Sequence, residues 1–280
     1  MKSRLDKVLK SNGRVMLSGP PGCGKELAAR YIHANSDRAG APFVTVNSAT
    51  IQPERMEEVL FGREHADRSI EKGLLEQAHG GILYFDEVAE MPLGTQSKIL
   101  RVLVDQKFQR VGGAGMVQVD MRVISSTTRD LEHEIAQGRF RQELYHRLNV
   151  VPMEVPGLTD RREDIPVLAE HFIAELNAGQ GLPKRALSDD AVAHLQTMDW
   201  PGNVRQLKNV IERVLILGPD KGPITVEELP TPEPAGGVET PAILTGQLAA
   251  LPLREARELF EREYLVAQIA RFGGNISRTA

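Results

Sequence analysis

A glycine-rich loop between an apolar strand and a helix is the feature that most constrains this chain. The loop follows the apolar segment Val15 to Leu17 and precedes a helical stretch that begins at Glu26. In this context the glycines let backbone N–H groups turn around phosphate oxygens, and the helix N-terminus adds its positive dipole end. The alternative is a plain strand-to-helix turn. The residues predicted to bind ATP or ADP are Gly19, Pro20, Pro21, Gly22, Cys23, Gly24, Lys25 and Glu26, with Lys25 on the β- and γ-phosphates.

Two carboxylates end a later apolar strand. Ile82 to Phe85 is followed directly by Asp86 and Glu87. Because the carboxyl end of a buried parallel strand faces the binding crevice, Asp86 is expected to hold Mg²⁺ and Glu87 to polarise the attacking water. The alternative is that both carboxylates cap the next helix. Glu26 stands where a phosphate loop usually has Ser or Thr for the metal, so the metal would depend on other oxygens.

The order of apolar segments predicts an α/β fold with a parallel sheet. From Arg14 to about Val155, β-branched runs alternate with helix-like stretches. Amphipathic helices are then expected at 164–177, 188–198 and 203–217, and a Pro- and Gly-rich stretch follows. The predicted parts are an α/β nucleotide-binding subdomain (1–156), a small helical subdomain (157–229), a linker (230–250) and a C-terminal helical segment (251–280).

Composition excludes several classes of protein. The chain has 280 residues, with 34 Lys and Arg against 38 Asp and Glu, and its net charge of −4 excludes a protein that is basic all over. No apolar run approaches a membrane span and no signal peptide is evident, so we expect a cytoplasmic protein without a membrane partner. The single Cys23 excludes an internal disulfide.

Several weaker signals lie outside the two motifs. Thr127 and Thr128 follow an apolar strand and are either water-positioning hydroxyls or plain turn residues. Arg141 and Arg147 are six residues apart on a helix-forming stretch. Spacing alone favours surface ion pairs with neighbours such as Glu143 over arginines that reach a phosphoryl group across a subunit boundary.

The segment WPGNVRQL starts a predicted helix with an apolar face. We expect Asn203 to cap this helix and Trp200 to lie in the core. Arg205 lies in the first turn, where the helix dipole disfavours a cation, and this placement indicates an anionic partner.

Together these segments resemble the AAA+ ATPase domain of bacterial enhancer-binding proteins, the activators that work on sigma-54 RNA polymerase. The resemblance covers residues 14–229 and includes GPPGCGKELAA, GGILYFDEVAEMP, GRFRQELYHRLNVVP and WPGNVRQLKNVIER. It implies that residues 157–229 are a lid, that Asn47 switches Glu87 between resting and active positions and that Arg205 senses the γ-phosphate. It also implies that Arg141 and Arg147 are fingers supplied in trans, within a homo-oligomer that is a dimer or a ring.

The tail from Leu253 is similar to the start of the family's factor-for-inversion-stimulation-like helix-turn-helix. This similarity implies that residues 251–280 are a truncated helix-turn-helix and that a complete C-terminal domain binds DNA. The tail and the segment FGREHADRS most resemble the NtrX type of nitrogen-related two-component response regulator. That resemblance implies a sensor histidine kinase as a partner, acting through a receiver domain that this chain does not contain.

Two departures from the family pattern affect the expected activity. After Leu60, Phe61 and Gly62 the sequence lacks the GAFTGA loop that grips sigma-54, which argues against remodelling of that polymerase. Thr128 replaces the family's usual Asn, which predicts slow hydrolysis. The first interpretation is therefore a weakly hydrolysing, ATP-binding, DNA-binding regulator. The alternatives are a non-hydrolysing scaffold whose assembly ATP controls, and a protein-remodelling or clamp-loading ATPase.

Overall fold

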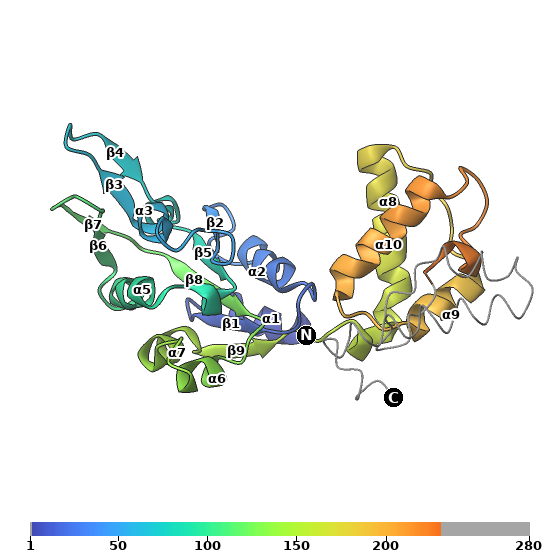
Figure 1. Ribbon diagram of the computed structural model, residues 1–280, viewed down its shortest axis with the longest axis horizontal. Coiled ribbons are helices and arrows are strands. Elements are labelled where there is room, and N and C mark those ends of the chain that lie inside the picture. The colour runs from blue at the N-terminus through green and yellow to red at the C-terminus, as the bar shows by residue number, and fades with distance from the viewer. Residues whose placement is uncertain (1, 231–280) are drawn as a thin grey trace, which may run out of the picture. The chain divides into compact units, whose positions relative to one another are not determined.

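The computed structural model describes residues 2–230 (Figure 1). The predicted helix-turn-helix and all but the first residue of the predicted linker lie outside the described residues. Residues 1–229 form one compact unit, so the boundary between 156 and 157 stays a prediction. Among the described residues, no helix has both the length and the apolar content needed to cross a bilayer.

Five parallel strands form the central sheet, in the order β2-β5-β8-β1-β9. Each of the five β-branched runs in the sequence becomes one of these strands, which confirms the predicted α/β fold. The strands, in sheet order, are β2 (Phe43–Asn47), β5 (Ile82–Asp86), β8 (Arg122–Thr127), β1 (Val15–Ser18) and β9 (Val151–Glu154).

Helices cover both faces of this sheet. Successive side chains of a strand point to opposite faces, and in β5 four consecutive side chains are buried, so both faces need a cover. Tyr84 and Ile124 pack with one hydrophobic cluster, whereas Phe85 and Val123 pack with another. The first cluster contains apolar residues of α1 (Lys2–Val8) and α2 (Lys25–Ala34). The second cluster contains apolar residues of α3 (Met56–Phe61), α4 (Leu74–Gln77), α5 (Leu93–Asp105), α6 (Leu131–Ala136) and α7 (Gln142–Leu148).

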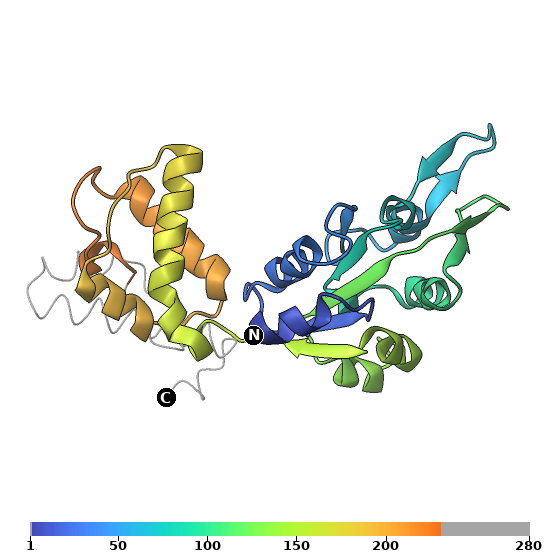
Figure 2. The ribbon, with the colours of Figure 1, turned by 180° about the vertical axis from the view of Figure 1, so that it is seen from behind.

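Two β-hairpins are additions that the sequence analysis did not predict. They are β3–β4 (Gly62–Glu64 with Ile70–Lys72) and β6–β7 (Lys107–Gln109 with Met116–Gln118). They lie side by side (Figures 1 and 2), since Arg63 pairs with Val111. Their strands have only three residues each, too few for a period-two pattern to stand out.

The helical region, residues 157–229, has its own core. Its helices are α8 (Ile165–Gln180), α9 (Asp189–Thr197) and α10 (Asn203–Leu217), close to the predicted ranges. Trp200 is 2% exposed and its indole N–H donates to the Leu195 carbonyl at 3.0 Å, which confirms the expected core position. Short 3-10 helices occur after β5 (η1, Val88–Glu90), before α8 (η2, Thr159–Asp164) and at the end of the region (η3, Val226–Glu228).

An ion pair joins η3 to the segment between α8 and α9. The buried Arg185 guanidinium donates to both carboxylate oxygens of Glu228, at 2.6 and 2.7 Å, and this hydrogen bonding lowers the pKa of Glu228. A lowered folded-state pKa gives stability that is present above the unfolded pKa of about 4.3 and lost as the pH falls through the folded value.

We therefore expect Glu228→Gln to destabilise the protein at pH 7 by about 1 kcal/mol or more, because Arg185 loses its anionic partner. Urea unfolding from pH 7 down to pH 3 measures this difference. The gap between wild type and variant should narrow as the pH falls below 4.3, because protonation removes the same charge from the wild type. A gap that stays constant with pH would contradict the assignment.

Candidate functional site

The glycine-rich loop joins β1 to α2 and forms a cradle of backbone amides. Gly22 and Gly24 have φ angles of 73° and 104°, in the left-handed region that favours glycine. A Cβ on Gly22 would lie 2.3 Å from the Gly202 carbonyl oxygen, whereas a Cβ on Gly24 would meet nothing within 4 Å. The loop is therefore packed against Gly202 on one side and open at Gly24. An open backbone without a side chain lets a ligand come close to the loop amides.

Lys25 is 6% exposed and begins α2. Its Nζ donates to the carbonyl oxygens of Gly19 and Pro20, at 2.9 and 3.3 Å, and lies 3.6 Å from Oε1 of Glu87. No carboxylate lies within ordinary hydrogen-bond distance of this ammonium among the described residues. A buried cation whose direct partners are neutral carbonyls is suited to receive an anion.

Asp86 ends β5 and is fixed by hydroxyl donors. Its Oδ1 accepts hydrogen bonds from Ser126 Oγ at 2.6 Å and from Tyr84 Oη at 3.0 Å. Burial raises the pKa of Tyr84 well above its usual value, so this phenol stays a donor. Within the described part of the chain, the single hydrogen bond to Oδ2 is a long one of 3.5 Å from Asn47 Nδ2. One carboxylate oxygen is thus left with acceptor capacity, which fits a hard cation such as Mg²⁺.

Glu87 has a backbone φ of 52° and holds its carboxylate between Lys25 and the end of β8. Its Oε2 accepts hydrogen bonds from the Thr128 amide at 2.9 Å and the Thr128 hydroxyl at 2.8 Å. The structure therefore brings Lys25, Asp86, Glu87 and Thr128 together. Non-glycine residues in this backbone region are uncommon and occur often at functional sites.

An apolar cavity of about 310 Å³ lies beside this cradle. It is walled by α1 and α2 through Leu5, Leu27 and Tyr31, and by the helical region through Leu168 and Val204. Cys23 and Gly24 of the glycine-rich loop also line it. Burial raises the pKa of the Cys23 thiol, so the thiol adds no negative charge. A mostly apolar hollow that opens onto a phosphate cradle suits a flat aromatic base.

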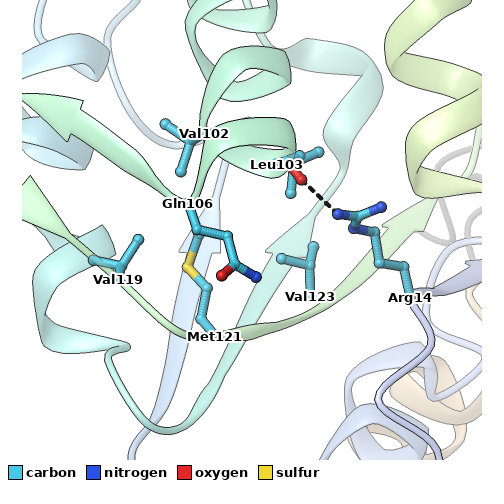
Figure 3. Close-up of a pocket in the computed structure, with 7 residues that line it drawn as sticks. All are labelled: Arg14, Val102, Leu103, Gln106, Val119, Met121 and Val123. Atoms are coloured by element: carbon cyan, nitrogen blue, oxygen red, sulfur yellow. Dashed lines mark hydrogen bonds between the residues drawn. The ribbon is translucent and has the colours of Figure 1, made fainter.

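Two other cavities lack these properties. The cavity in Figure 3, around Arg14, Val102 and Met121, has about 20 Å³, room for a single water molecule. Another, of about 340 Å³, is lined by three arginines that already have partners. Arg38 pairs with Asp120 at 3.0 Å, whereas Arg14 donates to the Leu103 carbonyl at 2.6 Å and Arg122 to the Val8 carbonyl at 2.8 Å. Since those carbonyls are the negative ends of α5 and α1, they offset the positive charge.

Other predicted site residues lie apart from the cradle or touch different partners. Glu26 is exposed and pairs with Arg30 at 2.7 Å. Asn47 contacts Asp86, while Thr128 binds Glu87, so the implied switch through Asn47 stays a prediction.

The two arginines predicted to act in trans are both exposed. Arg141 directly precedes α7, and Arg147 lies within it. Arg141 donates to the Leu93 carbonyl at 3.2 Å, and among residues 2–230 neither it nor Arg147 forms an ion pair. The expected surface pairing with neighbours such as Glu143 is therefore wrong. Arg205 is exposed in the first turn of α10, and its Cβ lies 3.1 Å from the position of a Cβ built on Gly22.

The expected helix cap at Asn203 is also wrong. Gly202 precedes the first helical residue, and Asn203, with φ 51°, is the first residue of α10 itself. Its Nδ2 donates to the Pro21 carbonyl at 2.9 Å and its Oδ1 accepts from the Leu158 amide at 2.6 Å. The side chain is thus used between segments far apart in sequence instead of on its own helix.

Comparisons with known proteins agree with this geometry. The model of the Sigma-54 interaction domain matches residues 1–154, and that of the AAA+ ATPase lid domain matches residues 159–239. The chain therefore belongs to the Sigma-54 interaction domain family, which confirms the resemblance seen in the sequence.

Individual relatives carry the NtrX name. The chain is 54% identical to the nitrogen assimilation regulatory protein NtrX of Azorhizobium caulinodans over 287 residues, covering 100% of this chain and 63% of the relative. Crystal structures of NtrX from Brucella abortus in complex with ATP and with ADP match with TM-scores of 0.77 and 0.78. Both are 54% identical and are matched over 62% of their length by the whole of this chain. The chain thus spans about three-fifths of the length of these relatives.

Proposed function

We propose that this chain binds ATP or ADP with Mg²⁺ and hydrolyses ATP slowly, as part of a DNA-binding two-component regulator of the NtrX type. The observation that carries the proposal is the meeting of Lys25, Asp86 and Glu87 at the carboxyl ends of β1 and β5, beside an apolar cavity. The similar Brucella abortus protein was crystallised with both nucleotides.

Binding is divided between three kinds of group. The cavity between α1, α2 and the helical region takes the adenine base, and Tyr31, which donates to Asp6 at 2.7 Å, ties α1 to α2 at the wall of the cavity. Backbone amides of the loop and Lys25 take the phosphates. Asp86 supplies one ligand to the metal, whose charge offsets that of the phosphates. No cluster of three or more metal-binding side chains occurs in residues 2–230.

Hydrolysis depends on Glu87, which orients and polarises the attacking water. In the structure Thr128 occupies one of its carboxylate oxygens, and the water must use the other. Arg141 and Arg147 come from a neighbouring subunit and stabilise charge on the transferred phosphoryl group. Arg205 contacts the γ-phosphate from the helical region. The active form is therefore a homo-oligomer.

The regulatory context follows from the family. DNA binding belongs to a complete C-terminal helix-turn-helix, and control belongs to a histidine kinase acting through a receiver domain. The β3–β4 hairpin occupies the place of the GAFTGA loop with a turn of five residues, His65 to Ser69. So short a hairpin leaves little surface for gripping sigma-54, so we infer regulation without remodelling of that polymerase.

A second function, a non-hydrolysing scaffold, is favoured by one observation. One carboxylate oxygen of Glu87 accepts two hydrogen bonds from Thr128, and the other faces the Lys25 ammonium at 3.6 Å. If these contacts persist with ATP bound, Glu87 is unable to activate water, and the nucleotide only sets the assembly or DNA-binding state.

Nucleotide titrations and phosphate release test both functions. Calorimetry with ATP, ADP and adenosine should show binding of all three, tighter with phosphates. At 100 times the dissociation constant, ATP should stabilise the protein by about 2.7 kcal/mol. Phosphate release per subunit should rise with protein concentration, whereas no turnover at any concentration would leave only the scaffold. No heat with ATP or ADP would overturn nucleotide binding itself.

A further inference from the structure

Three consecutive carbonyls of the phosphate loop accept hydrogen bonds from the helical region. Asn203 Nδ2 donates to the Pro21 carbonyl at 2.9 Å, and Arg161 Nη2 donates to the Cys23 carbonyl at 2.7 Å. Between them, the Arg205 amide donates to the Gly22 carbonyl at 3.3 Å. The two short bonds come from side chains, so they are set by residue identity.

These bonds fix the direction of the loop amides. In a trans peptide the carbonyl of one residue and the N–H of the next point in opposite directions. A bond to the Pro21 carbonyl therefore orients the Gly22 N–H away from Asn203. The bond to the Cys23 carbonyl likewise orients the Gly24 N–H away from Arg161. Among the described residues neither of these two N–H groups has a protein acceptor, so both are available to a ligand.

We propose that Asn203 and Arg161 are positioning residues of the nucleotide site, which hold the phosphate loop in its anion-binding shape through hydrogen bonds to its carbonyl oxygens. The inference rests on the proposed function, since it concerns the same loop. It adds that the helical region contributes to phosphate affinity through the backbone of the loop, separately from Arg205.

The burial, backbone angles and hydrogen-bond partners of both residues fit this role. Asn203 is 4% exposed, and its Oδ1 is anchored by the Leu158 amide at 2.6 Å. Asn is among the few non-glycine residues that adopt its φ of 51° readily. Arg161 interrupts η2 with a non-helical φ of −143°, and its buried Nε has no partner within residues 2–230. The Cys23 carbonyl is therefore its main hydrogen-bond acceptor, apart from a 3.9 Å ion pair with Asp164.

The test compares ADP with adenosine, which lacks phosphates. Asn203→Asp keeps the acceptor for Leu158 and removes the donor to Pro21. It also adds a negative charge that itself disfavours phosphates, so its result is compared with that of Arg161→Lys, which keeps the charge at the other position. Arg161→Met keeps much of the side-chain volume and removes the donor to Cys23. Each variant should bind ADP about ten-fold or more weakly, because preorganisation of the amides is lost.

Asn203→Asp should bind adenosine within about twofold of wild type, because Asn203 does not line the cavity. Arg161 lines the cavity, so Arg161→Met should lose some adenosine affinity, but much less than it loses for ADP. Calorimetry measures ADP, and chemical-shift titration measures the weaker adenosine.

Two matched controls lie wholly within the helical region. Asn177 donates to the Leu182 carbonyl at 2.7 Å and Arg162 to the Met198 carbonyl at 2.8 Å. Asn177→Asp and Arg162→Met should leave the affinity ratio of ADP to adenosine unchanged. Arg161→Lys, which keeps the charge, should bind ADP with an affinity between those of wild type and Arg161→Met. This variant keeps the inference testable if Asn203→Asp fails to fold.

Two results would overturn the inference while wild-type ADP binding stands. One is ADP affinity that stays at the wild-type level in both variants. The other is an equal loss for ADP and adenosine, which would mean that the two side chains only support the fold of the cavity. Wild-type protein that fails to bind ADP would instead refute the proposed function.

Discussion

Lys25→Met is expected to weaken ATP binding by about 100-fold or more, the largest effect on affinity of any single substitution in this chain. The ammonium is 6% exposed and bonds only to carbonyl oxygens of its own loop, so phosphate oxygens would be its first short-range anionic partners. Calorimetric titration with ATP measures the loss. Methionine is unbranched and only one atom shorter than lysine, so it keeps most of the side-chain volume while it removes the charge and the hydrogen bonds to Gly19 and Pro20.

Lys98→Met is the matched control, because Lys98 is a half-exposed lysine whose Nζ pairs with Glu57 at 2.6 Å. It should bind ATP as wild type does. Circular dichroism should show that both variants melt within a few degrees of wild type without nucleotide, and ATP should raise the melting temperature only of the control. If Lys25→Met retained wild-type affinity, the glycine-rich loop would not be a phosphate site.

The sequence predicted the central sheet and the main site residues because both depend on local patterns. Apolar runs such as Ile82 to Phe85 are buried on both faces of a parallel sheet, so they read as continuous hydrophobic segments. Because parallel strands expose their carboxyl ends at one edge, Lys25, Asp86 and Thr128 could be expected to meet there. In the structure Lys25 lies 3.6 Å from the Glu87 carboxylate and Thr128 donates hydrogen bonds to it, while Asp86 is the preceding residue.

Contacts between distant segments were missed because no local pattern encodes them. Ser126 donates to Asp86 because β5 and β8 are neighbours in the sheet and Phe85 lies opposite Ser125. The next residue of each strand, Asp86 and Ser126, is therefore also close to the other, which the order of the strands in the sheet could have indicated. Asn203 looked like a cap because Asn before an apolar face usually is one. Its bond to the Pro21 carbonyl spans 182 positions of sequence, and only the folded chain reveals it.

Glu87→Gln is expected to lower the rate of ATP hydrolysis by about 100-fold or more while ATP affinity changes little. The amide oxygen of glutamine still accepts the hydrogen bonds that Thr128 donates, so the geometry is kept and only the charge that polarises water is lost. Phosphate release under saturating ATP measures the rate. Glu90→Gln, whose carboxylate pairs with Arg129, is the control and should hydrolyse ATP as wild type does.

A mixture of two inactive variants tests whether the site is shared between subunits. Arg147→Ala should also lower turnover by about 100-fold or more, since the arginine would act on the nucleotide of its neighbour. When Glu87→Gln and Arg147→Ala proteins are mixed, some interfaces join an intact Glu87 to an intact Arg147. Roughly a quarter of the sites would regain both groups in a head-to-tail assembly with random pairing. Recovered phosphate release in the mixture, above that of either protein alone, is the expected result. If the mixture stays inactive although both proteins co-assemble, Arg147 does not complete a neighbour's site, and hydrolysis, where it occurs, is confined to groups of one chain.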